Sequence, residues 1–427
     1  MEIITNPSRN MWIKLLERPG ANETQKRESV QQILLDVRKN GDKAIRKYTR
    51  ALDNADIQEL RVDMKAVSQQ IESLDAELKR AINQAAGNIK KFHRAQKADD
   101  LEVEVQPGIT CMQRSVPLEK VGIYVPGGNA PLFSSVLMLA IPAAIAGCRE
   151  IYLFTPPGKD GNVDPAILYA AKISGVRNVY RIGGAQAIAA MAYGTETIPA
   201  VDKILGPGNQ YVTLAKQMVN AEGIAIDMPA GPSEVLVVAD ETCPPEYVAA
   251  DLLSQAEHGS DSQVLLVTQD ETLPAKVNDK IEDYLQFLSR DQYTMEALKN
   301  SKMIVMKSED EMIDLVNFYA PEHLIVETDD PDRIGNRIVN AGSVFLGRYT
   351  PESLGDYASG TNHVLPTSGA ARAYSGVNTD TFMKKITFQH ATREGLQTIA
   401  PIVTRMAEAE WLDAHKLAVE VRLNEKQ

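Results

Sequence analysis

The chain has 427 residues, enough for two or three domains, and its 44% hydrophobic and 24% charged residues are those of a folded globular protein. A net charge of −12, without any lysine- or arginine-rich block, argues against nucleic acids and anionic membranes as partners. The three cysteines have no CxxC spacing, which fits a reducing cytoplasm and predicts that any metal is bound by nitrogen and oxygen atoms.

The N-terminal stretch has no apolar core of signal-peptide length, so no secretion is expected. The longest apolar tract, residues 131–148, is interrupted by two serines and Pro142, and it falls short of the roughly 20 residues that span a bilayer. We therefore expect a cytoplasmic protein in which this tract is a buried helix.

Residues 25–97 are predicted to be helical, because breakers are few and apolar residues in the second half recur every three or four positions. Core packing is the simplest explanation of this apolar stripe. Residues 1–24 are expected to form an N-terminal arm. We assign residues 25–120 to the same domain as residues 234–375.

From Val121 the chain repeats strand, glycine turn and helix. The predicted strands are 121–125, 151–154, 179–182 and 203–205, and glycine turns follow three of them. This alternation predicts a doubly wound, mainly parallel sheet over residues 121–233. The turns would let phosphates of a nucleotide approach backbone N–H groups, although glycine also serves simply to make tight turns, and none of these is GxGxxG.

A second alternating series begins at Ser233, with predicted strands at 235–238, 264–267, 304–306, 324–326 and 344–346. The fold class is therefore α/β, with two incomplete Rossmann-like parallel-sheet domains, an N-terminal helical segment and an extended helical C-terminal tail. The tail, residues 376–427, is predicted to be helical from Thr381. It must pack on something, and a partner subunit is one candidate.

Four polar side chains precede two of these strands. Gln255 and His258 share a face of the helix before 264–267, and Glu322 and His323 stand directly before 324–326. If both strands are parallel members of one sheet, all four lie at its amino-terminal edge, opposite the usual ligand edge of open α/β sheets. Taken alone, His258 is more simply a structural histidine.

The polar loop 350–363 contains Asp356 and His363 and is a candidate lid for this site, with an ordinary surface loop as the alternative. Neighbouring residues of an extended chain point to opposite faces. A turn at Pro321 is therefore expected to bring both Glu322 and His323 into the site.

Six motifs in chain order resemble the histidinol dehydrogenase family over essentially the whole chain. They are YVPGG from Tyr124, GPGN from Gly206, SQAEHG from Ser254, APEHL from Ala320, GDYASGTNHVLPT from Gly355 and AEWLDAHK from Ala409. The resemblance implies oxidation of L-histidinol to L-histidine through L-histidinal, the last steps of histidine biosynthesis. It also implies two NAD⁺, one zinc ion per subunit, and a homodimer with shared active sites.

The resemblance also assigns residues. The implied zinc ligands are Gln255, His258, Asp356 and His415. His323 would be the general base, and Glu322 would activate water in the aldehyde step. Substrate contacts would come from the zinc ligands and His323 together with Ser233, His363 and Glu410; NAD contacts would come from Tyr124, Gln186 and Asn209. Glu410 and His415 would reach the site from the neighbouring subunit's tail, which is expected to be exchanged.

Three alternatives remain open at this point. A relative with the same ligands could oxidise another polar alcohol, although the carboxylate of Glu410 suits a cationic amino alcohol. A zinc-dependent hydrolase would also use histidines, an acid and an activated water. A catalytically silent metal- or nucleotide-binding protein would leave the pair Glu322 and His323 unexplained.

Overall fold

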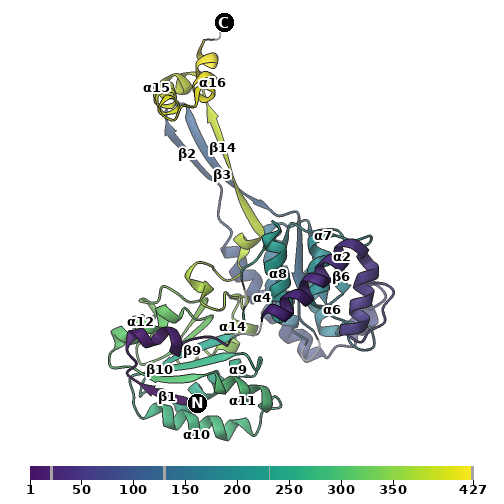
Figure 1. Cartoon of the computed structure of the whole chain (residues 1–427), viewed down its shortest axis with the longest axis vertical. Coiled ribbons are helices and arrows are strands. Elements are labelled where there is room, and N and C mark those ends of the chain that lie inside the picture. Colours follow the sequence, from purple (N-terminus) through teal and green to yellow (C-terminus); the bar gives the residue numbers. More distant parts are fainter. Residues whose placement is uncertain (20–22, 128–130, 230, 425–427) are drawn as a thin grey trace.

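The computed structural model describes residues 1–19, 23–127, 131–229 and 231–424, with the backbone alone for Glu23 and Thr24. The described chain forms two parallel sheets flanked by helices and an antiparallel arm that projects from them (Figure 1). The α/β class and the helical C-terminal end are therefore confirmed. No helix among the described residues is long and apolar enough to cross a membrane.

The larger sheet has six parallel strands in the order β1-β11-β10-β9-β12-β13. Alternate residues of β9 face opposite helix layers: Val235 and Val237 pack with α9, whereas Leu236 and Val238 pack with α12. Burial on both faces explains the uninterrupted apolar runs of the central strands. The elements are β1 (Glu2–Thr5), α1 (Trp12–Leu15), β9 (Glu234–Ala239), α9 (Pro245–Ala256), β10 (Gln263–Thr268), α10 (Leu273–Leu285), α11 (Asp291–Lys299), β11 (Lys302–Val305), α12 (Glu309–Tyr319), β12 (His323–Glu327), α13 (Pro331–Gly335) and β13 (Ser343–Leu346).

The second sheet has five parallel strands in the order β6-β5-β4-β7-β8. Helices α4, α5 and α6 cover one face, and α2, α7 and α8 cover the other. The elements are α2 (Glu23–Leu52), α3 (Ser68–Glu72), α4 (Ala76–Ala95), β4 (Lys120–Tyr124), α5 (Phe133–Ala146), β5 (Glu150–Thr155), α6 (Pro165–Ile173), β6 (Asn178–Arg181), α7 (Gly184–Tyr193), β7 (Lys203–Leu205), α8 (Gln210–Ala221) and β8 (Ala225–Ile226).

The first long helices pack on a different sheet from the one expected. Helix α2 packs on α7 and α8, and α4 packs on α5, so residues 25–95 accompany the five-stranded sheet instead of residues 234–375. Residues 1–16 accompany the six-stranded sheet, because β1 pairs with β11 and Trp12 is buried against that sheet. The predicted helix 25–97 is also interrupted: Gly41 kinks α2 with φ 49°, and residues 53–67 are not helical.

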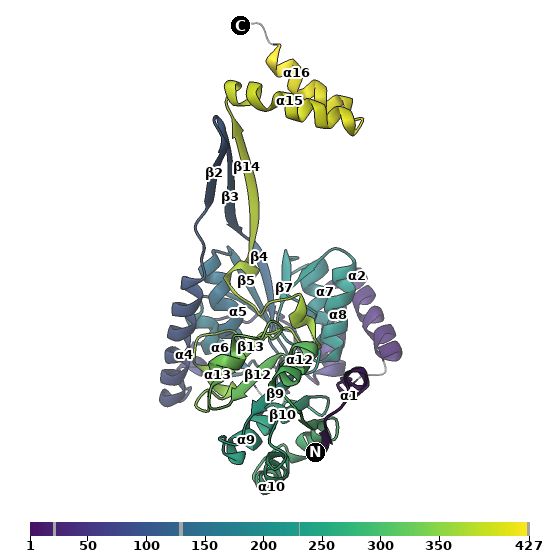
Figure 2. The same cartoon turned by 90° about the vertical axis from the view of Figure 1, so that its left-hand side faces the viewer.

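The antiparallel arm was not expected from the sequence. Its strands are β2 (Leu101–Gln106), β3 (Ile109–Pro117) and β14 (Met383–Ala391), in the order β14-β3-β2, and it ends in α15 (Arg393–Ala409) and α16 (Asp413–Leu423). The prediction of helix from Thr381 was wrong for β14. This strand pairs with residues 266 to 282 positions earlier and is mostly exposed, so its pattern carries no burial signal. Figures 1 and 2 show α15 and α16 at the far end of the arm, away from both parallel sheets.

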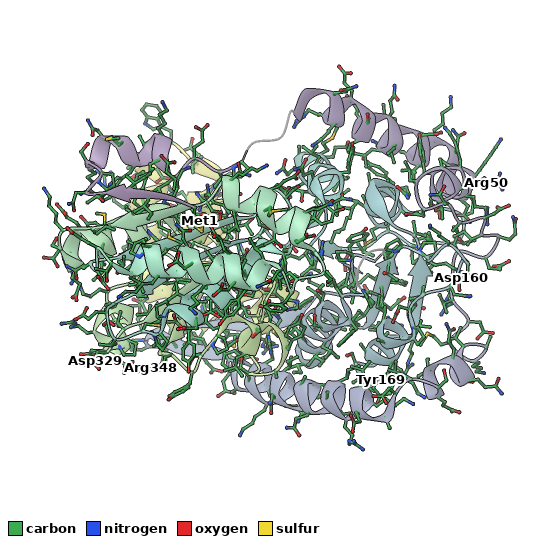
Figure 3. All side chains as sticks on the ribbon, turned by 90° about the horizontal axis from the view of Figure 1, so that it is seen from below. Met1, Arg50, Asp160, Tyr169, Asp329 and Arg348 are labelled. Carbon is green, nitrogen blue, oxygen red and sulfur yellow. The ribbon has the colours of Figure 1, made fainter. Side chains whose placement is uncertain are left out.

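The carboxyl-terminal edge of the five-stranded sheet faces the amino-terminal edge of the six-stranded sheet. Asp329 and Arg348, which follow the carboxyl ends of β12 and β13, lie on the outer side of the six-stranded half (Figure 3). The amino ends of these strands consequently turn toward the five-stranded half. The segment between β13 and β14 includes α14 (Glu352–Tyr357) and the short 3-10 helices η2 (Ala370–Arg372) and η3 (Thr379–Phe382); a third, η1 (Arg9–Met11), precedes α1.

Candidate active site

A cleft of about 970 Å³ lies between the two halves. The five-stranded half contributes glycine turns at the carboxyl ends of its strands, and the six-stranded half contributes residues at the amino ends of its strands. The lining includes Tyr124, Gly127, Gly208, Asn209, Ser233, His258, Asp261, Arg290 and Thr367. The five-stranded half thus supplies the wall that the amino-terminal edge of the six-stranded sheet lacks.

Glu322 and His323 enter the site through a tight helix-to-strand connection. Helix α12 ends at Tyr319, its cap residue Ala320 has a left-handed φ of 54°, and β12 begins at His323. A non-glycine residue in this region costs about 1 kcal/mol or more, so the surrounding structure must enforce it. The turn places Oε2 of Glu322 3.6 Å from Nδ1 of His323. Both side chains therefore reach one site, as the turn at Pro321 was expected to allow.

The imidazole of His323 is buried among acceptors. Nδ1 lies 3.3 Å from the backbone oxygen of Glu234 and 3.9 Å from Oε1 of Glu352, and Nε2 lies 3.6 Å from Oδ1 of Asp356. His323, Glu352 and Asp356 present potential ligand atoms within 4.8 Å of one another. Nε2 of His323, Oε2 of Glu352 and Oδ1 of Asp356 are buried without a hydrogen-bond partner among the described residues. Such atoms mark a site built for a further group.

The buried carboxylates control the protonation of this cluster. Burial by itself would lower the pKa of His323, but the negative charges of Glu352 and Glu322 outweigh it and raise that pKa well above its ordinary value. Burial also raises the pKa of Glu352, and Asp356 and Glu322 add to this effect while His323 opposes it. A divalent cation would relieve this concentration of negative charge.

Gln255 and His258 come from the end of α9 and the turn after it. Gln255 is fully buried, and its side-chain amide lies 3.3 Å from Nδ1 of His323. His258 is exposed and lines the cleft, but desolvation by the surrounding protein lowers the pKa of its imidazole, against the opposing charges of Asp356 and Glu322. Both residues therefore lie around the same cluster as Asp356.

Ser233 and His363 occupy two different places. Ser233 lines the cleft directly, just before β9. His363 is half-buried; its Nδ1 is 2.8 Å from the backbone oxygen of Asp356, and its Nε2 is 3.1 Å from the hydroxyl of Ser135 in α5. His363 thereby ties the segment that carries Asp356 to the five-stranded half.

The three expected NAD contacts lie at the glycine turns. The hydroxyl of Tyr124 accepts a hydrogen bond from the N–H of Gly184 at 3.1 Å, and burial raises the pKa of Tyr124 to about 12. Asn209 caps α8 and lines the cleft. Gly206, with φ +118°, could not be replaced, because a Cβ there would lie 2.1 Å from the carbonyl oxygen of Tyr124.

Gln186 lies beside a carboxyl that the sequence analysis did not single out. Its amide nitrogen donates to Oδ2 of Asp53 at 3.4 Å, while its buried Oε1 has no partner among the described residues. Burial raises the pKa of Asp53 to about 6. Asp53 follows α2, far from any motif, so only the tertiary fold reveals it.

Glu410 and His415 do not join the cleft of their own chain. Both are exposed, at the end of α15 and in α16, on the far tip of the arm (Figures 1 and 2). A single chain therefore brings together Gln255, His258 and Asp356, but not the fourth residue of the expected zinc set.

The sequence analysis also missed Glu234 and Glu352. Glu234 is 1% exposed at the start of the apolar strand β9, and Glu352 is 1% exposed in α14. An acidic residue at the entrance of an otherwise apolar strand was the available signal for Glu234, since a buried carboxylate needs partners. Glu352 lay within a polar segment that resembled any surface loop.

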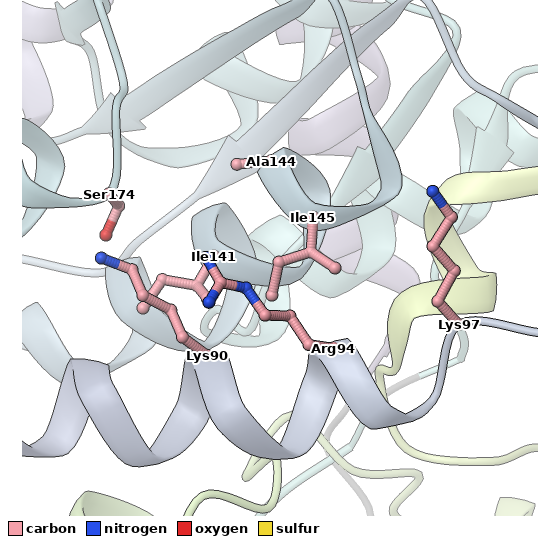
Figure 4. A pocket seen from close by; sticks show the side chains of 7 residues that line it. All are labelled: Lys90, Arg94, Lys97, Ile141, Ala144, Ile145 and Ser174. Carbon is pink, nitrogen blue, oxygen red and sulfur yellow. The ribbon is translucent and has the colours of Figure 1, made fainter.

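A second hollow, of about 320 Å³, is lined by Lys90 and Arg94 of α4, by Lys97 just after that helix, and by residues at the carboxyl ends of α5 and α6 (Figure 4). Lys90 donates to the backbone oxygen of Ile173, which ends α6. Cations stabilise helix carboxyl ends, whose carbonyl groups are otherwise unpaired. These basic side chains thus have a structural explanation, and none of the residues around this hollow forms an acid–base pair.

Fold and site together define an α/β protein in which a buried histidine surrounded by carboxyl groups lies beside a cleft between two parallel sheets. A family model described as histidinol dehydrogenase matches residues 16–423. A histidinol dehydrogenase of Bacteroides thetaiotaomicron is 54% identical over 424 residues, covering 99% of each chain. One of Vibrio parahaemolyticus is 51% identical over 415 residues, covering 96% of this chain and 95% of the relative.

A solved structure agrees with these sequence relatives. The crystal structure of histidinol dehydrogenase from Elizabethkingia anophelis matches with a TM-score of 0.96 at 50% identity, covering 99% of this chain and 98% of that chain. The chain belongs to the histidinol dehydrogenase family and is an oxidoreductase.

Proposed function

We propose that the chain oxidises L-histidinol to L-histidine through L-histidinal, with two NAD⁺ and one zinc ion per subunit. Membership of the family supports the overall reaction. The observation that carries the chemistry is the setting of His323, a buried imidazole held among Glu322, Glu352 and Asp356 beside the cleft. The glycine turns on the opposite wall favour a dinucleotide over the hydrolase alternative.

Zinc would be held by Gln255, His258 and Asp356 of one chain and by the partner subunit's His415. The donor set suits the metal, because imidazole nitrogen and carboxylate or amide oxygen are accepted zinc ligands. The buried Oδ1 of Asp356, which has no hydrogen-bond partner in the described part of the chain, supports the assignment. His323 and Glu352 also lie within ligand distance of Asp356, but we leave His323 outside the ligand set, since a metal on Nε2 would block its use as a base. When bound, zinc supplies positive charge that places the substrate's amine and imidazole.

His323 would begin the reaction as the general base. An alcohol carbon releases hydride only as its hydroxyl proton leaves, and a positioned base contributes roughly 10²- to 10⁴-fold to such a step. Nε2 would take this proton, and Glu322 and Glu352 would stabilise the resulting imidazolium. NAD⁺ supplies the hydride acceptor, so the first step yields the aldehyde, NADH and one proton.

Glu322 would serve the second oxidation. The aldehyde carbon can release a hydride only after water has added to it to form a hydrate. A carboxylate is needed to accept a proton from that water. Glu322 is 6% exposed and lies beside His323, and this proximity supports a role for both residues as proton acceptors in one site. The hydrate would then give its carbon-bound hydrogen as hydride to a second NAD⁺ and lose two protons, which yields NADH and the carboxylate of histidine.

The cofactor would bind at the glycine turns, with Tyr124, Gln186 and Asn209 as its contacts. Tyr124 and Asn209 line the cleft. The buried Oε1 of Gln186 has no hydrogen-bond partner among the residues that the structure describes, which supports a role for that amide. Bound there, NAD⁺ would come from the five-stranded wall while the substrate is held by the six-stranded wall, where Ser233 also lies.

A homodimer with exchanged tails, residues 376–427, would complete each site. Glu410 and His415 are exposed on an arm that leaves the body of its own chain. The arm also exposes apolar side chains that a partner would cover: Trp411 is 90% exposed, and Ile402, Met406, Leu417 and Val421 are each 48% to 60% exposed. Their burial would favour dimerisation through the hydrophobic effect.

The proposal is tested by assaying the purified protein with NAD⁺ and a panel of polar alcohols, with and without a chelator. We expect NADH only from histidinol, loss of turnover after chelation, and recovery when zinc is returned. NADH formed from another alcohol but not from histidinol would favour a different substrate. Product formation from histidinol derivatives without NAD⁺ would favour the hydrolase.

A further inference from the structure

Glu234 and Glu322 form a reciprocal pair at the start of β9 and β12. The N–H of Glu234 donates to Oε2 of Glu322 at 3.0 Å, and the N–H of Glu322 donates to Oε1 of Glu234 at 3.2 Å. Each carboxylate thus fixes the backbone of the other residue. Because all of these atoms are buried, the orientation of Glu322 depends directly on Glu234.

Glu234 also sets the tautomer of His323. Its backbone oxygen lies 3.3 Å from Nδ1, and the nearest carboxylate oxygens on that side, from Glu322 and Glu352, are acceptors as well. When the Gln255 amide is turned so that its nitrogen donates to Glu352 at 2.6 Å, its oxygen is the atom 3.3 Å from Nδ1. In the neutral imidazole Nδ1 then carries the hydrogen, which leaves Nε2 as the nitrogen that can accept a proton.

Arg18 holds Glu234 from the other side. Its guanidinium donates to Oε2 of Glu234 at 2.5 Å and to Oε1 at 2.9 Å, and it also donates to the backbone oxygen of Tyr319 at 2.9 Å. The same guanidinium lies 4.0 Å from the centre of the Tyr319 ring, and the Tyr319 hydroxyl completes the shell of Glu234 at 3.3 Å. A bidentate arginine fixes both the position and the plane of a carboxylate.

Arg18 lies in the N-terminal arm, which the proposed mechanism does not use. This N-terminal arm contributes strand β1 to the six-stranded sheet, places helix α1 beside that sheet, and then passes the amino end of β9. The chain of contacts runs from Arg18 through Glu234 to both Glu322 and His323.

We propose that Arg18 and Glu234 are positioning residues for the acid–base pair: Arg18 fixes the carboxylate of Glu234, and Glu234 fixes Glu322 and the Nδ1–H tautomer of His323. The inference rests on the proposed function, because it assigns a purpose to contacts around residues with proposed roles. Neither Arg18 nor Glu234 is among the described residues that line the cleft. Changing them should therefore slow the chemical step without weakening ligand binding.

The test compares Arg18→Gln, Arg18→Lys and Glu234→Gln in a stopped-flow single turnover of the zinc-loaded protein with histidinol and NAD⁺. The amplitude of NADH formation counts folded, loaded sites, whereas its rate constant reports the alignment of the reacting groups. We expect the rate constant of Arg18→Gln to fall roughly ten- to a hundredfold, as for other outer-shell partners. Arg18→Lys keeps the positive charge but cannot make the bidentate contact, so its rate constant should lie between those of Arg18→Gln and the wild type. KM for both ligands should stay within about threefold.

Arg372→Gln is the matched control. Arg372 contacts Phe318 in the way that Arg18 contacts Tyr319. It donates to the backbone oxygen of Phe318, and its guanidinium lies over the Phe318 ring, 5.7 Å from the ring centre. These contacts do not include Glu234. Its rate constant should equal that of the wild type. If Arg18→Gln lowers only the amplitude, or if Arg372→Gln slows the reaction equally, the positioning role is overturned and Arg18 merely stabilises the fold. A wild-type protein that forms no NADH from histidinol would instead refute the proposed function.

Discussion

Nε2 of His323 lies 3.6 Å from Oδ1 of Asp356, and both atoms are buried without a hydrogen-bond partner among the described residues. The two belong to different elements, β12 and α14, which only the fold brings together. The nitrogen proposed to accept the substrate's proton thus stands beside a carboxylate proposed to hold the metal. A substrate oxygen placed between base and metal would contact both.

Replacing His323 with asparagine should remove the base and leave the metal site in place. We expect kcat for histidinol to fall by roughly 10²- to 10⁴-fold, the usual contribution of general-base catalysis. Zinc content, measured by atomic absorption, should stay at the wild-type value. Loss of the metal together with the activity would show instead that His323 is a ligand.

Glu322→Gln should affect the second oxidation more than the first. Gln keeps an oxygen that can accept the hydrogen bond from the N–H of Glu234, so the local fold should survive. Turnover of histidinal should fall at least about a hundredfold, because no carboxylate remains to take the proton from water. The first oxidation should slow less. Glu327→Gln, a buried carboxyl at the other end of β12, is the control and should leave the ratio of the two rates unchanged.

Asp53 gives a prediction about stability and pH. Burial raises its pKa from 3.8 to about 6, so the folded protein holds this proton more tightly than the unfolded chain. Stability from this group is therefore present at low pH and is lost as pH rises through about 6. Asp53→Asn should stabilise the protein at pH 8 by about 1–2 kcal/mol, a value reduced for partial solvent screening, and should make little difference near pH 4.

Thermal unfolding midpoints at several pH values measure this effect. Asp160→Asn provides a contrast of the opposite sign, because hydrogen bonds from Asn162 lower the pKa of Asp160. A gain from Asp53→Asn that is equal at pH 4 and pH 8 would rule out titration as its cause.

Exchange of tails predicts complementation between two inactive variants. His258→Ala and His415→Ala homodimers should each be inactive. In a hybrid dimer, one site would carry both changes and the other neither, so co-expression should restore about a quarter of wild-type activity. If the tail serves its own chain, every site of the hybrid keeps one defect and no activity returns.

The parallel sheets could be predicted because their signals are local. The apolar runs at Val235 and Val264 and the regular spacing of helices between them specify buried strands without any knowledge of their neighbours. The arm could not, because β14 pairs with β3 across more than 260 residues and exposes most of its surface. Its strands depend on pairing, whose sequence signal is weak.

The same distinction applies to the site. Gln255, His258, Glu322 and His323 could be placed at one sheet edge because each stands directly before a recognisable parallel strand. Arg18 and Asp53 could not, since their partners lie far away in sequence: Arg18 meets Glu234 across 216 residues, and Asp53 meets Gln186 across 133. Glu352 could not either, because nothing in its polar segment signals burial beside His323.

The central claim is that one site oxidises histidinol twice. The most direct measurement incubates the purified, zinc-loaded protein with histidinol and excess NAD⁺, and counts NADH against histidine formed. The account predicts two NADH for each histidine, with both products lost when a chelator removes the metal. One NADH with histidinal as the final product, or histidine formed without NADH, would contradict it.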